Sequence, residues 1–257
     1  MEEWRLEQYR LHAKLSGHRR LVDRALGLIE EALNTDRSWY VSWSGGKDSN
    51  ALLHLVRRLK LDVPIMHFDT ELDYPDCRET VTRWIDEWRI AEQTTVLRPD
   101  VSLWEIIDRH GGPEMQVNRA SSELDKKGFF EPVARYVEER GYTGVFMGLR
   151  AEESRGRRMN RRMRGPMYAT ARGMMHCNPL ADWRVADVWA YTVANDIPWL
   201  PVYDKIRGHP CPERIREGWY PVGGFQVSQG GLVWLRANYP ELFQELKRRY
   251  PYYTTGV

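Results

Sequence analysis

The sequence predicts an α/β protein with an open, mostly parallel, doubly wound sheet that carries helices on both faces. The first observation is alternation: between residues 38 and 149, short β-branched and aromatic runs alternate with helix-length segments, as in βαβ units. The second is a glycine-rich turn at 44–49, between an apolar run and a helical pattern. The third is size, because 257 residues of which 42% are hydrophobic can fill one large core.

A helical extension, residues 1–35, is expected to precede the sheet. Apolar residues recur at helical spacing between Leu21 and Leu33, and a break is expected near Ser16 and Gly17. The extension could cover a sheet edge or form a contact between subunits of a homo-oligomer. The sequence leaves both alternatives open.

Four strands and their connecting helices should follow in regular alternation. β-branched and aromatic residues predict strands at 38–43, 63–68, 94–98 and 143–149. Helices are predicted after the first strand and at 76–90, 101–112 and 130–141, with Gly141 ending the last. The inner face of the first of these helices should carry Ala51, Leu52, Leu55, Val56 and Leu59.

The pattern changes after residue 150. Arginines accumulate from residue 154 to 181 without any acidic residue, and the glycines and proline there predict a long loop or flap. A helix is expected at 182–196 with Asp182 as its N-cap, and a last helix at 240–250. The expected organisation is a sheet domain at 36–205, with an irregular segment and helix at 206–257 packed on it.

Composition excludes several classes of protein. No stretch approaches the roughly 20 apolar residues of a membrane span, and the charged N-terminus lacks the apolar block of a secretion signal. Cys77, Cys177 and Cys211 lie far apart, against a disulfide framework or a closed zinc site. We therefore expect a cytoplasmic protein without a membrane partner.

The turn "SGGKDS" at 44–49 has the chemistry of an anion site. Gly45 and Gly46 allow close approach of the backbone, and the unpaired amides and dipole of the following helix favour a phosphate. Lys47 adds a positive charge. Ser44 and Ser49 add hydroxyl donors. Asp48 could cap the helix or hold Mg²⁺. Neither the P-loop nor the dinucleotide fingerprint fits, because Val41 stands where the P-loop needs glycine and the two glycines are adjacent.

The hexapeptide resembles the pyrophosphate loop of the PP-loop ATP pyrophosphatase superfamily. Three later segments are similar to its phosphoadenosine phosphosulfate (PAPS) reductase and sulfate adenylyltransferase small-subunit branch: 67–84, 148–157 and 178–205. The resemblance implies that the loop binds the β and γ phosphates of ATP, so that the α phosphorus is attacked and pyrophosphate leaves. It also implies an adenine-nucleotide α-hydrolase-like fold.

The same resemblance assigns candidate residues. Asp69 and Thr70 would lie beside the nucleotide, and Asp48 or Asp69 would touch Mg²⁺. Lys47, Asp48 and Arg150 would act in catalysis. The phosphate or sulfate end of the site would be lined by Arg150, Glu153, Ser154, Arg155, Arg157 and Arg158.

The chain departs from the reductase pattern. No cysteine follows Cys211, where reductases carry a cysteine in a C-terminal tail, and three isolated cysteines cannot supply four ligands, so no iron–sulfur cluster is expected. The leading hypothesis is therefore adenylyl transfer from ATP and Mg²⁺, in sulfur metabolism or in sulfur modification of nucleic acid such as DNA phosphorothioation. The alternatives are a PAPS or adenylyl-sulfate (APS) reductase using an external thiol, and a nucleotide-binding module without turnover.

The arginines at 155–172 have three interpretations. They could form a solvated flap, a lid that closes on adenylyl-sulfate, or a track for nucleic acid or another polyanion. A sulfur-donor protein is a further candidate partner. The sequence does not name the acceptor of the adenylyl group.

Overall fold

A computed structural model describes residues 1–112, 123–205 and 231–255 of the chain. The chain forms two compact units. Unit 1 consists of Met1–Phe68, Glu79–Leu97 and Tyr136–Leu200, and unit 2 of Asp69–Arg78, Arg98–Arg135 and Pro201–Val257. Each unit is considered separately below.

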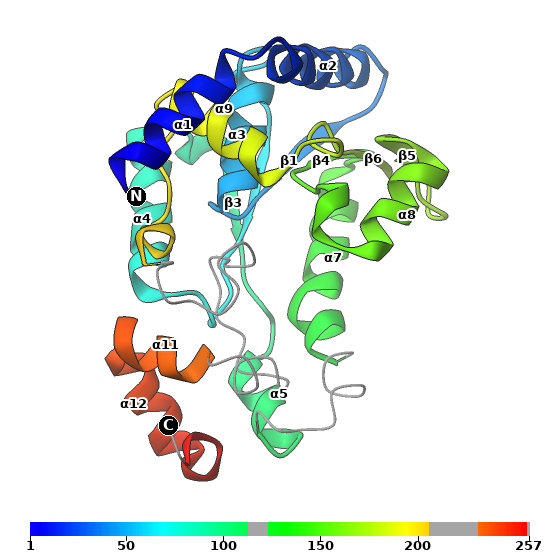
Figure 1. Ribbon diagram of the computed structural model, residues 1–257. Coiled ribbons are helices and arrows are strands. Elements are labelled where there is room, and N and C mark those ends of the chain that lie inside the picture. The colour runs from blue at the N-terminus through cyan, green and yellow to red at the C-terminus, as the bar shows by residue number, and fades with distance from the viewer. Residues whose placement is uncertain (113–122, 206–230, 256–257) are drawn as a thin grey trace. The chain divides into compact units, whose positions relative to one another are not determined.

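Unit 1 contains an open, mostly parallel sheet, which confirms the predicted fold class (Figure 1). Its strand order is β3-β2-β1-β4-β6-β5, and every pairing is parallel except that of β5 with β6. The strands are β1 (Trp39–Trp43), β2 (Ile65–Phe68), β3 (Thr94–Leu97), β4 (Gly144–Met147), β5 (Met167–Ala169) and β6 (Met175–Cys177). The four predicted strands are confirmed, whereas β5 and β6 were not predicted.

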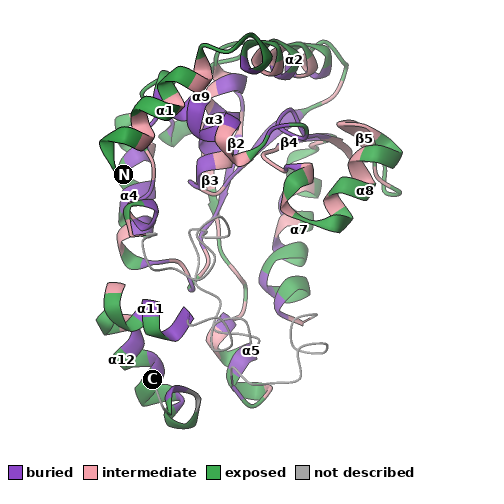
Figure 2. Ribbon diagram, viewed as in Figure 1, coloured by how far each residue is buried: buried purple, intermediate pink, exposed green. Residues whose placement is uncertain are grey.

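The core of unit 1 follows the central strands. Val41 pairs with Ile65 on one side and Phe146 on the other, and all three side chains are fully buried. Figure 2 shows the same central strands in purple, with buried residues also on the helices that pack against them. Apolar residues at successive positions of these strands are expected where helices cover both faces of a parallel sheet.

Helices cover the sheet of unit 1 and one another. The N-terminal extension breaks into two helices, α1 and α2, as predicted. Helix α1 packs on α9, and α9 in turn contacts α3 (Figure 1). Helix α1 therefore covers a helix rather than a sheet edge. On the other face, Tyr40 meets Tyr136 edge to face. The helices that lie in this unit wholly or in part are α1 (Glu3–Ala13), α2 (Ser16–Leu33), α3 (Lys47–Arg57), α4 (Pro75–Glu87), α7 (Glu131–Arg140), α8 (Arg155–Arg164) and α9 (Val185–Ala194).

The arginine-rich segment is not the predicted loop. It forms helix α8 and then the antiparallel β5–β6 hairpin. Ser154 caps α8, since its Oγ accepts from the amide of Arg157, and Gly165 ends the helix with a φ of 82°. The prediction was wrong because the glycines of this segment were taken as helix breakers. Gly156 instead lies in the first turn of α8, and Gly165 follows its last turn.

Two further predictions about helices were wrong. Asp182 does not cap α9. The helix begins at Val185, and the carboxylate of Asp187 accepts the amide of Arg184, while Asp182 pairs with Arg161. Leu59 does not lie on the inner face of α3, which ends at Arg57, and it is 44% exposed.

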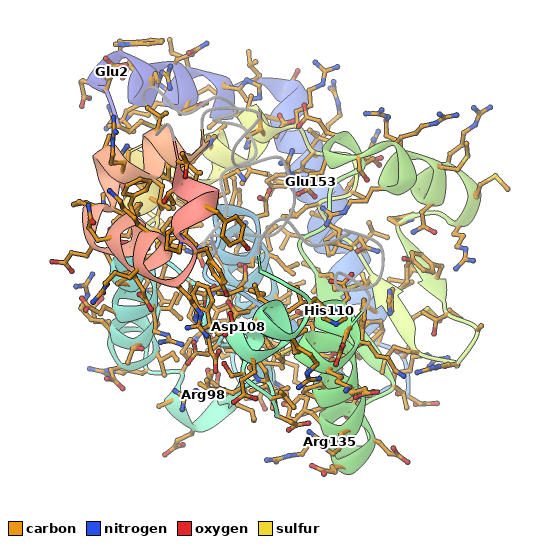
Figure 3. All side chains as sticks on the ribbon, turned by 90° about the horizontal axis from the view of Figure 1, so that it is seen from below. Glu2, Arg98, Asp108, His110, Arg135 and Glu153 are labelled. Carbon is orange, nitrogen blue, oxygen red and sulfur yellow. The ribbon has the colours of Figure 1, made fainter. Side chains whose placement is uncertain are left out.

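Unit 2 is helical and rich in aromatic contacts. Tyr74 stacks on Tyr239 with ring centroids 4.3 Å apart, and Arg249 donates to Asp108, labelled in Figure 3, at 2.6 Å. Its remaining helices are α5 (Leu103–Arg109), α11 (Gly231–Asn238) and α12 (Pro240–Arg249). The predicted last helix is confirmed, α11 was not predicted, and most of the segment predicted to be irregular lies outside the described residues. Within the residues that the structure describes, no helix combines the length and apolarity that a bilayer span requires.

Candidate nucleotide site

The loop at 44–49 lies where the winding of the sheet changes direction. From β1 the chain moves to β2 and β3 on one side, and β4 returns to the other side of β1. The loop follows β1, and Gly148 to Arg150 follow β4, so both segments leave the same edge of the sheet at neighbouring strands. Open α/β sheets bind ligands at this kind of switch point.

Hydroxyl groups hold the loop in shape. Ser49 Oγ donates to the carbonyl of Gly46 at 2.9 Å and accepts the amide of Ser44 at 3.2 Å, while Ser44 Oγ accepts the amide of Gly46 at 3.3 Å. Helix α3 begins within this hexapeptide, at Lys47, and no side chain caps it. Its first amides have no carbonyl acceptor within the helix, so this turn can receive an anion without breaking the helix.

Two glycines permit this geometry. Gly45 has a φ of 80°, and a Cβ there would lie 2.4 Å from Val81 Cγ2. A Cβ on Gly148 would lie 3.0 Å from the carbonyl carbon and oxygen of Asp48. The end of β4 therefore touches the backbone of the first turn of α3, and this close approach places Arg150 beside the loop.

Lys47, Asp48 and Arg150 form one ionic cluster. Lys47 Nζ lies 2.9 Å from Asp48 Oδ2, and Arg150 Nε lies 2.5 Å from Asp48 Oδ1. Lys47 and Arg150 are 6% and 3% exposed. Burial opposes ionisation of Asp48, but the charges of Lys47 and Arg150 outweigh it, and the pKa of this carboxyl falls below its ordinary value. The three residues predicted to be catalytic therefore lie together.

Two further carboxylates, those of Glu152 and Glu153, accept hydrogen bonds from Arg150. Arg150 Nη1 lies 2.5 Å from Glu152, and the amide of Arg150 donates to Glu153 Oε2 at 2.8 Å. Arg157, in the first turn of α8, pairs with the same oxygen of Glu153, which is labelled in Figure 3. Burial alone would lower the pKa of Arg150, but the charges of Asp48 and Glu153 raise it above its usual value. Its guanidinium therefore stays charged.

A cavity of about 210 Å³ adjoins Arg150 and α8. Its walls include Arg150, Arg157 and Arg161, together with the polar side chains of Asn160 and Tyr168. It can hold a phosphate or sulfate group but is below the size of a whole-ligand pocket. Asn160, Arg161 and Tyr168 were not predicted as site residues; their positions depend on α8 and on the β5–β6 hairpin, which the sequence did not predict.

Two of the other predicted anion-binding residues, Ser154 and Glu153, accept hydrogen bonds from the protein itself. Ser154 is the cap of α8, and Glu153 is an acceptor for arginines. Arg155 and Arg158 are exposed on α8. Arg157 is the arginine of α8 linked to the loop, through Glu153 and Arg150.

Asp69 and Thr70 belong to unit 2. The Asp69 carboxylate accepts from Arg78 Nη2 at 2.6 Å and from Arg98 Nε at 2.9 Å, and Thr70 donates to Asp73 at 2.8 Å. Two guanidinium groups already neutralise Asp69.

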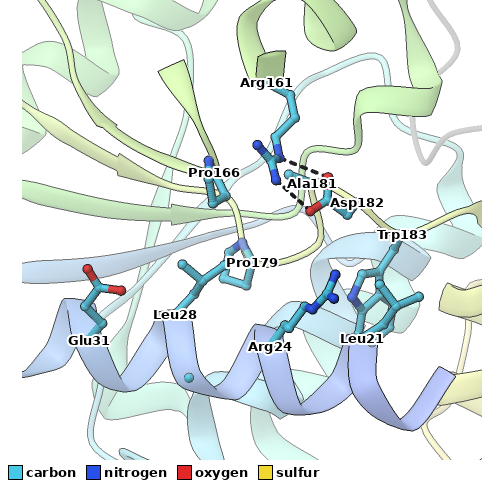
Figure 4. A pocket seen from close by; sticks show the side chains of 11 residues that line it. Leu21, Arg24, Leu28, Glu31, Arg161, Pro166, Pro179, Ala181, Asp182 and Trp183 are labelled. Atoms are coloured by element: carbon cyan, nitrogen blue, oxygen red, sulfur yellow. Dashed lines mark hydrogen bonds and ion pairs between the residues drawn. The ribbon is translucent and has the colours of Figure 1, made fainter. Parts of the chain in front are cut away.

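A larger cavity lies in unit 1 against α2 (Figure 4). It measures about 380 Å³, and its lining includes Leu21 and Leu28 of α2 and the Arg161–Asp182 ion pair. The side chains drawn in Figure 4 include none from the loop at 44–49. Arg161 lines both cavities.

The described cysteines do not have the environment of a nucleophile. Cys77 and Cys177 are both buried, and burial raises the pKa of the Cys177 thiol to about 12. Cys211 lies outside the described residues. Two buried or partly buried histidines also have partners: His54 Nδ1 lies 2.8 Å from Tyr191 Oη, and His67 Nδ1 lies 3.1 Å from the Trp43 carbonyl oxygen.

The fold and the loop define a PP-loop protein of the adenine-nucleotide α-hydrolase type. Residues 38–230 match the phosphoadenosine phosphosulfate reductase domain, and the chain belongs to that family.

One curated relative and two solved structures illustrate what this chain is similar to. A phosphoadenosine 5'-phosphosulfate reductase of Xanthomonas euvesicatoria pv. vesicatoria is 29% identical over 189 residues, 74% of this chain and 70% of the relative. The phosphate complex of Candida auris PAPS reductase is similar with a TM-score of 0.55 and 20% identity, covering 79% of this chain and 92% of that one. Candida glabrata FMN adenylyltransferase is similar with a TM-score of 0.54 and 14% identity, covering 77% and 64%. The structural likenesses show the fold alone.

Proposed function

We propose that this protein binds ATP with its β and γ phosphates in the loop at 44–49 and transfers the adenylyl group to an acceptor. An acceptor oxygen would attack the α phosphorus, the bond from that phosphorus to the α–β bridging oxygen would break, and pyrophosphate would leave with the bonding electrons. The observation that carries the proposal is the Lys47–Asp48–Arg150 cluster at the switch point of the sheet.

The cluster supplies mobile positive charge for the leaving group. Asp48 holds both cations next to the amides of α3. When a triphosphate enters, its oxygens compete with the Asp48 carboxylate for Lys47 and Arg150. Both cations can then neutralise charge that grows on the leaving pyrophosphate, which is the main requirement of phosphoryl-group chemistry.

Asp48 is a better candidate ligand for Mg²⁺ than Asp69. Asp48 is ionised, and binding of phosphates would release its oxygens from Lys47 and Arg150. Asp69 already accepts from two arginines. When bound, Mg²⁺ would neutralise phosphate charge.

The cavity beside Arg150 suits the anionic end of an acceptor or of an adenylyl-sulfate. Its arginines can make paired hydrogen bonds to a sulfate or phosphate. Sulfate, an adenylyl-sulfate, a nucleic-acid phosphate and a small metabolite are therefore the acceptors to test.

Helix α8 is the proposed contact for a polyanionic partner. Arg155, Arg158 and Arg162 follow one another at intervals of three and four residues and are exposed, so they share one helix face. Three aligned guanidinium groups suit successive phosphates of a nucleic acid, and a role in sulfur modification of nucleic acid would use this face.

Reduction of PAPS or APS with an external thiol is the second candidate, because the family and the Xanthomonas relative carry the name of that activity. The environments of Cys77 and Cys177 do not favour an internal nucleophile at either position. A reductase would release sulfite from its nucleotide when a dithiol protein is added.

One assay separates these functions. The protein is incubated with ATP, Mg²⁺ and each acceptor, and in parallel with PAPS or APS and a dithiol protein. Pyrophosphate, adenylylated products and sulfite are measured. We expect pyrophosphate with one acceptor and none with Lys47→Ala. Sulfite release from PAPS or APS without pyrophosphate would support the reductase, and nucleotide binding without turnover on any acceptor would support a binding module.

A further inference from the structure

We infer that His12, His18 and Asp187 form a binding site for a divalent transition metal, with Zn²⁺ the best match. The three residues come from α1, α2 and α9, all within unit 1. One ligand atom from each residue lies within 4.8 Å of the other two. The site is separate from the nucleotide loop and is independent of the proposed function.

A single carboxylate oxygen faces both imidazoles. Asp187 Oδ1 lies 2.7 Å from His12 Nε2 and 3.5 Å from His18 Nδ1. Tetrahedral Zn²⁺ with bonds of about 2.0–2.1 Å requires ligand atoms about 3.3 Å apart. The separation of Asp187 Oδ1 from His18 Nδ1 is already close to that value. Its separation from His12 Nε2 would have to increase by about 0.6 Å.

His18 supplies the observation that points to a ligand. Its side chain is 4% exposed, and its Nδ1 is buried without a hydrogen-bond partner among the described residues. At 3.5 Å, the contact with Asp187 is too long for a good hydrogen bond.

The surroundings orient the donors as a metal site requires. The other oxygen of Asp187 accepts the amide of Arg184 at 2.8 Å, which fixes the carboxylate with Oδ1 toward the histidines. The ring of Trp183 lies edge to face with His18 at 5.7 Å. The His12 side chain is 31% exposed, which leaves a route of entry for the ion and for a water as the fourth ligand.

A metal here would fasten the N-terminal helix pair. His12 lies in the last turn of α1 and His18 in the first turn of α2, on either side of the corner between them. Asp187 lies in the first turn of α9, against which α1 packs. One ion would therefore join three helices at one point.

The test uses untagged, chelator-treated full-length protein titrated with Zn²⁺, and with Co²⁺ as a spectroscopic probe. We expect one ion per chain, visible absorption bands of four-coordinate Co²⁺, and slower tryptic cleavage after Lys14 and Arg19 when Zn²⁺ is bound. His12→Gln and His18→Gln should each weaken Zn²⁺ binding by at least about 100-fold. His176→Gln, in β6 and outside the cluster, is the matched control and should bind like the wild type.

Two results would overturn the site. One is the absence of stoichiometric Zn²⁺ or Co²⁺ binding by the wild-type protein, which would leave a hydrogen-bonded triad only. The other is unchanged affinity in both His12→Gln and His18→Gln. Circular dichroism of each variant checks folding, and His12→Gln, at a partly exposed position, decides the matter if His18→Gln does not fold.

Discussion

Arg150 Nε lies 2.5 Å from Asp48 Oδ1, and this pair joins the segment after β4 to the first turn of α3. The residues are 102 positions apart in the chain. Because Lys47 holds the other oxygen of Asp48, the carboxylate links two cations beside the same group of backbone amides. The cluster is thus charged and largely buried.

Removal of Arg150 should therefore lower both stability and turnover. Arg150→Ala removes a buried cation and leaves the largely buried Asp48 carboxylate with one positive partner fewer, and we expect a loss of about 3 kcal/mol in the free energy of unfolding. Arg150→Lys keeps the charge but cannot bridge both acidic partners, so turnover should still fall at least about 100-fold. Urea unfolding and pyrophosphate release measure the two effects.

Arg161→Ala is the control for Arg150, since Arg161 pairs with the partly exposed Asp182 and should change stability by about 1 kcal/mol or less. Equal losses of stability in the Arg150 and Arg161 alanine variants would contradict the account of a buried cluster.

The same cluster predicts an acid dependence of stability. The folded pKa of Asp48 lies below its unfolded value, so its contribution is fully present above the unfolded pKa, near 3.8, and is lost as the pH falls toward the folded pKa. Urea unfolding between pH 3 and 5.5 should show a shallower loss of stability at low pH in Asp48→Asn than in the wild type. Parallel curves for the two proteins would show that Asp48 is not held as an ion.

Gly45 offers a test of loop geometry with a matched control. Gly45→Ala and Gly173→Ala should each cost about 1–2 kcal/mol, because both glycines have a φ near +80°. Only the Cβ at position 45 meets Val81, so Gly45→Ala should lose a further 1–3 kcal/mol, roughly, and most of its ATP affinity. Calorimetric titration with ATP and thermal unfolding compare the variants.

Val81→Ala should restore part of the loss in the Gly45→Ala background, since it removes the Cγ2 atom that the new Cβ would strike. Identical ATP affinity in Gly45→Ala and Gly173→Ala would refute a close approach of phosphates to this turn.

The exposed face of α8 predicts the salt dependence of polyanion binding. Replacement of Arg155, Arg158 and Arg162 by glutamine removes three charges, so the slope of log affinity against log salt should become shallower by about 2 for single-stranded and about 3 for double-stranded nucleic acid. Fluorescence anisotropy at several salt concentrations measures the slope. An unchanged slope would exclude this face as the contact.

Much of unit 1 could be predicted from the sequence because its signals are local. The alternation of strands and helices, and the strand–turn–helix at 38–57, needed no long-range information. Helix α8 was missed because glycine commonly ends helices, and one glycine, Gly156, lies in its first turn and another, Gly165, at its C-cap. The two strands after it have three residues each, too few for a periodic pattern.

The candidate site was predicted in its composition but not in its contacts. The motif indicated Lys47, Asp48 and Arg150 separately, whereas only the fold brings Arg150 to Asp48. The role of Gly148 likewise depends on two strands lying side by side, whereas the sequence placed this glycine in a predicted strand and at the start of a matched segment without indicating its contact with Asp48. Asp187 was part of a matched segment, but its two histidine neighbours come from helices more than 160 residues earlier in the chain.

The fate of the γ phosphate of ATP tests the central claim most directly. With γ-labelled ATP, Mg²⁺ and the acceptor, we expect the label to appear in pyrophosphate, the adenylyl group on the acceptor, and neither product with Lys47→Ala. Label released as orthophosphate by the wild-type protein would mean that the terminal bond is cleaved, and it would contradict the assignment of the loop to the β and γ phosphates.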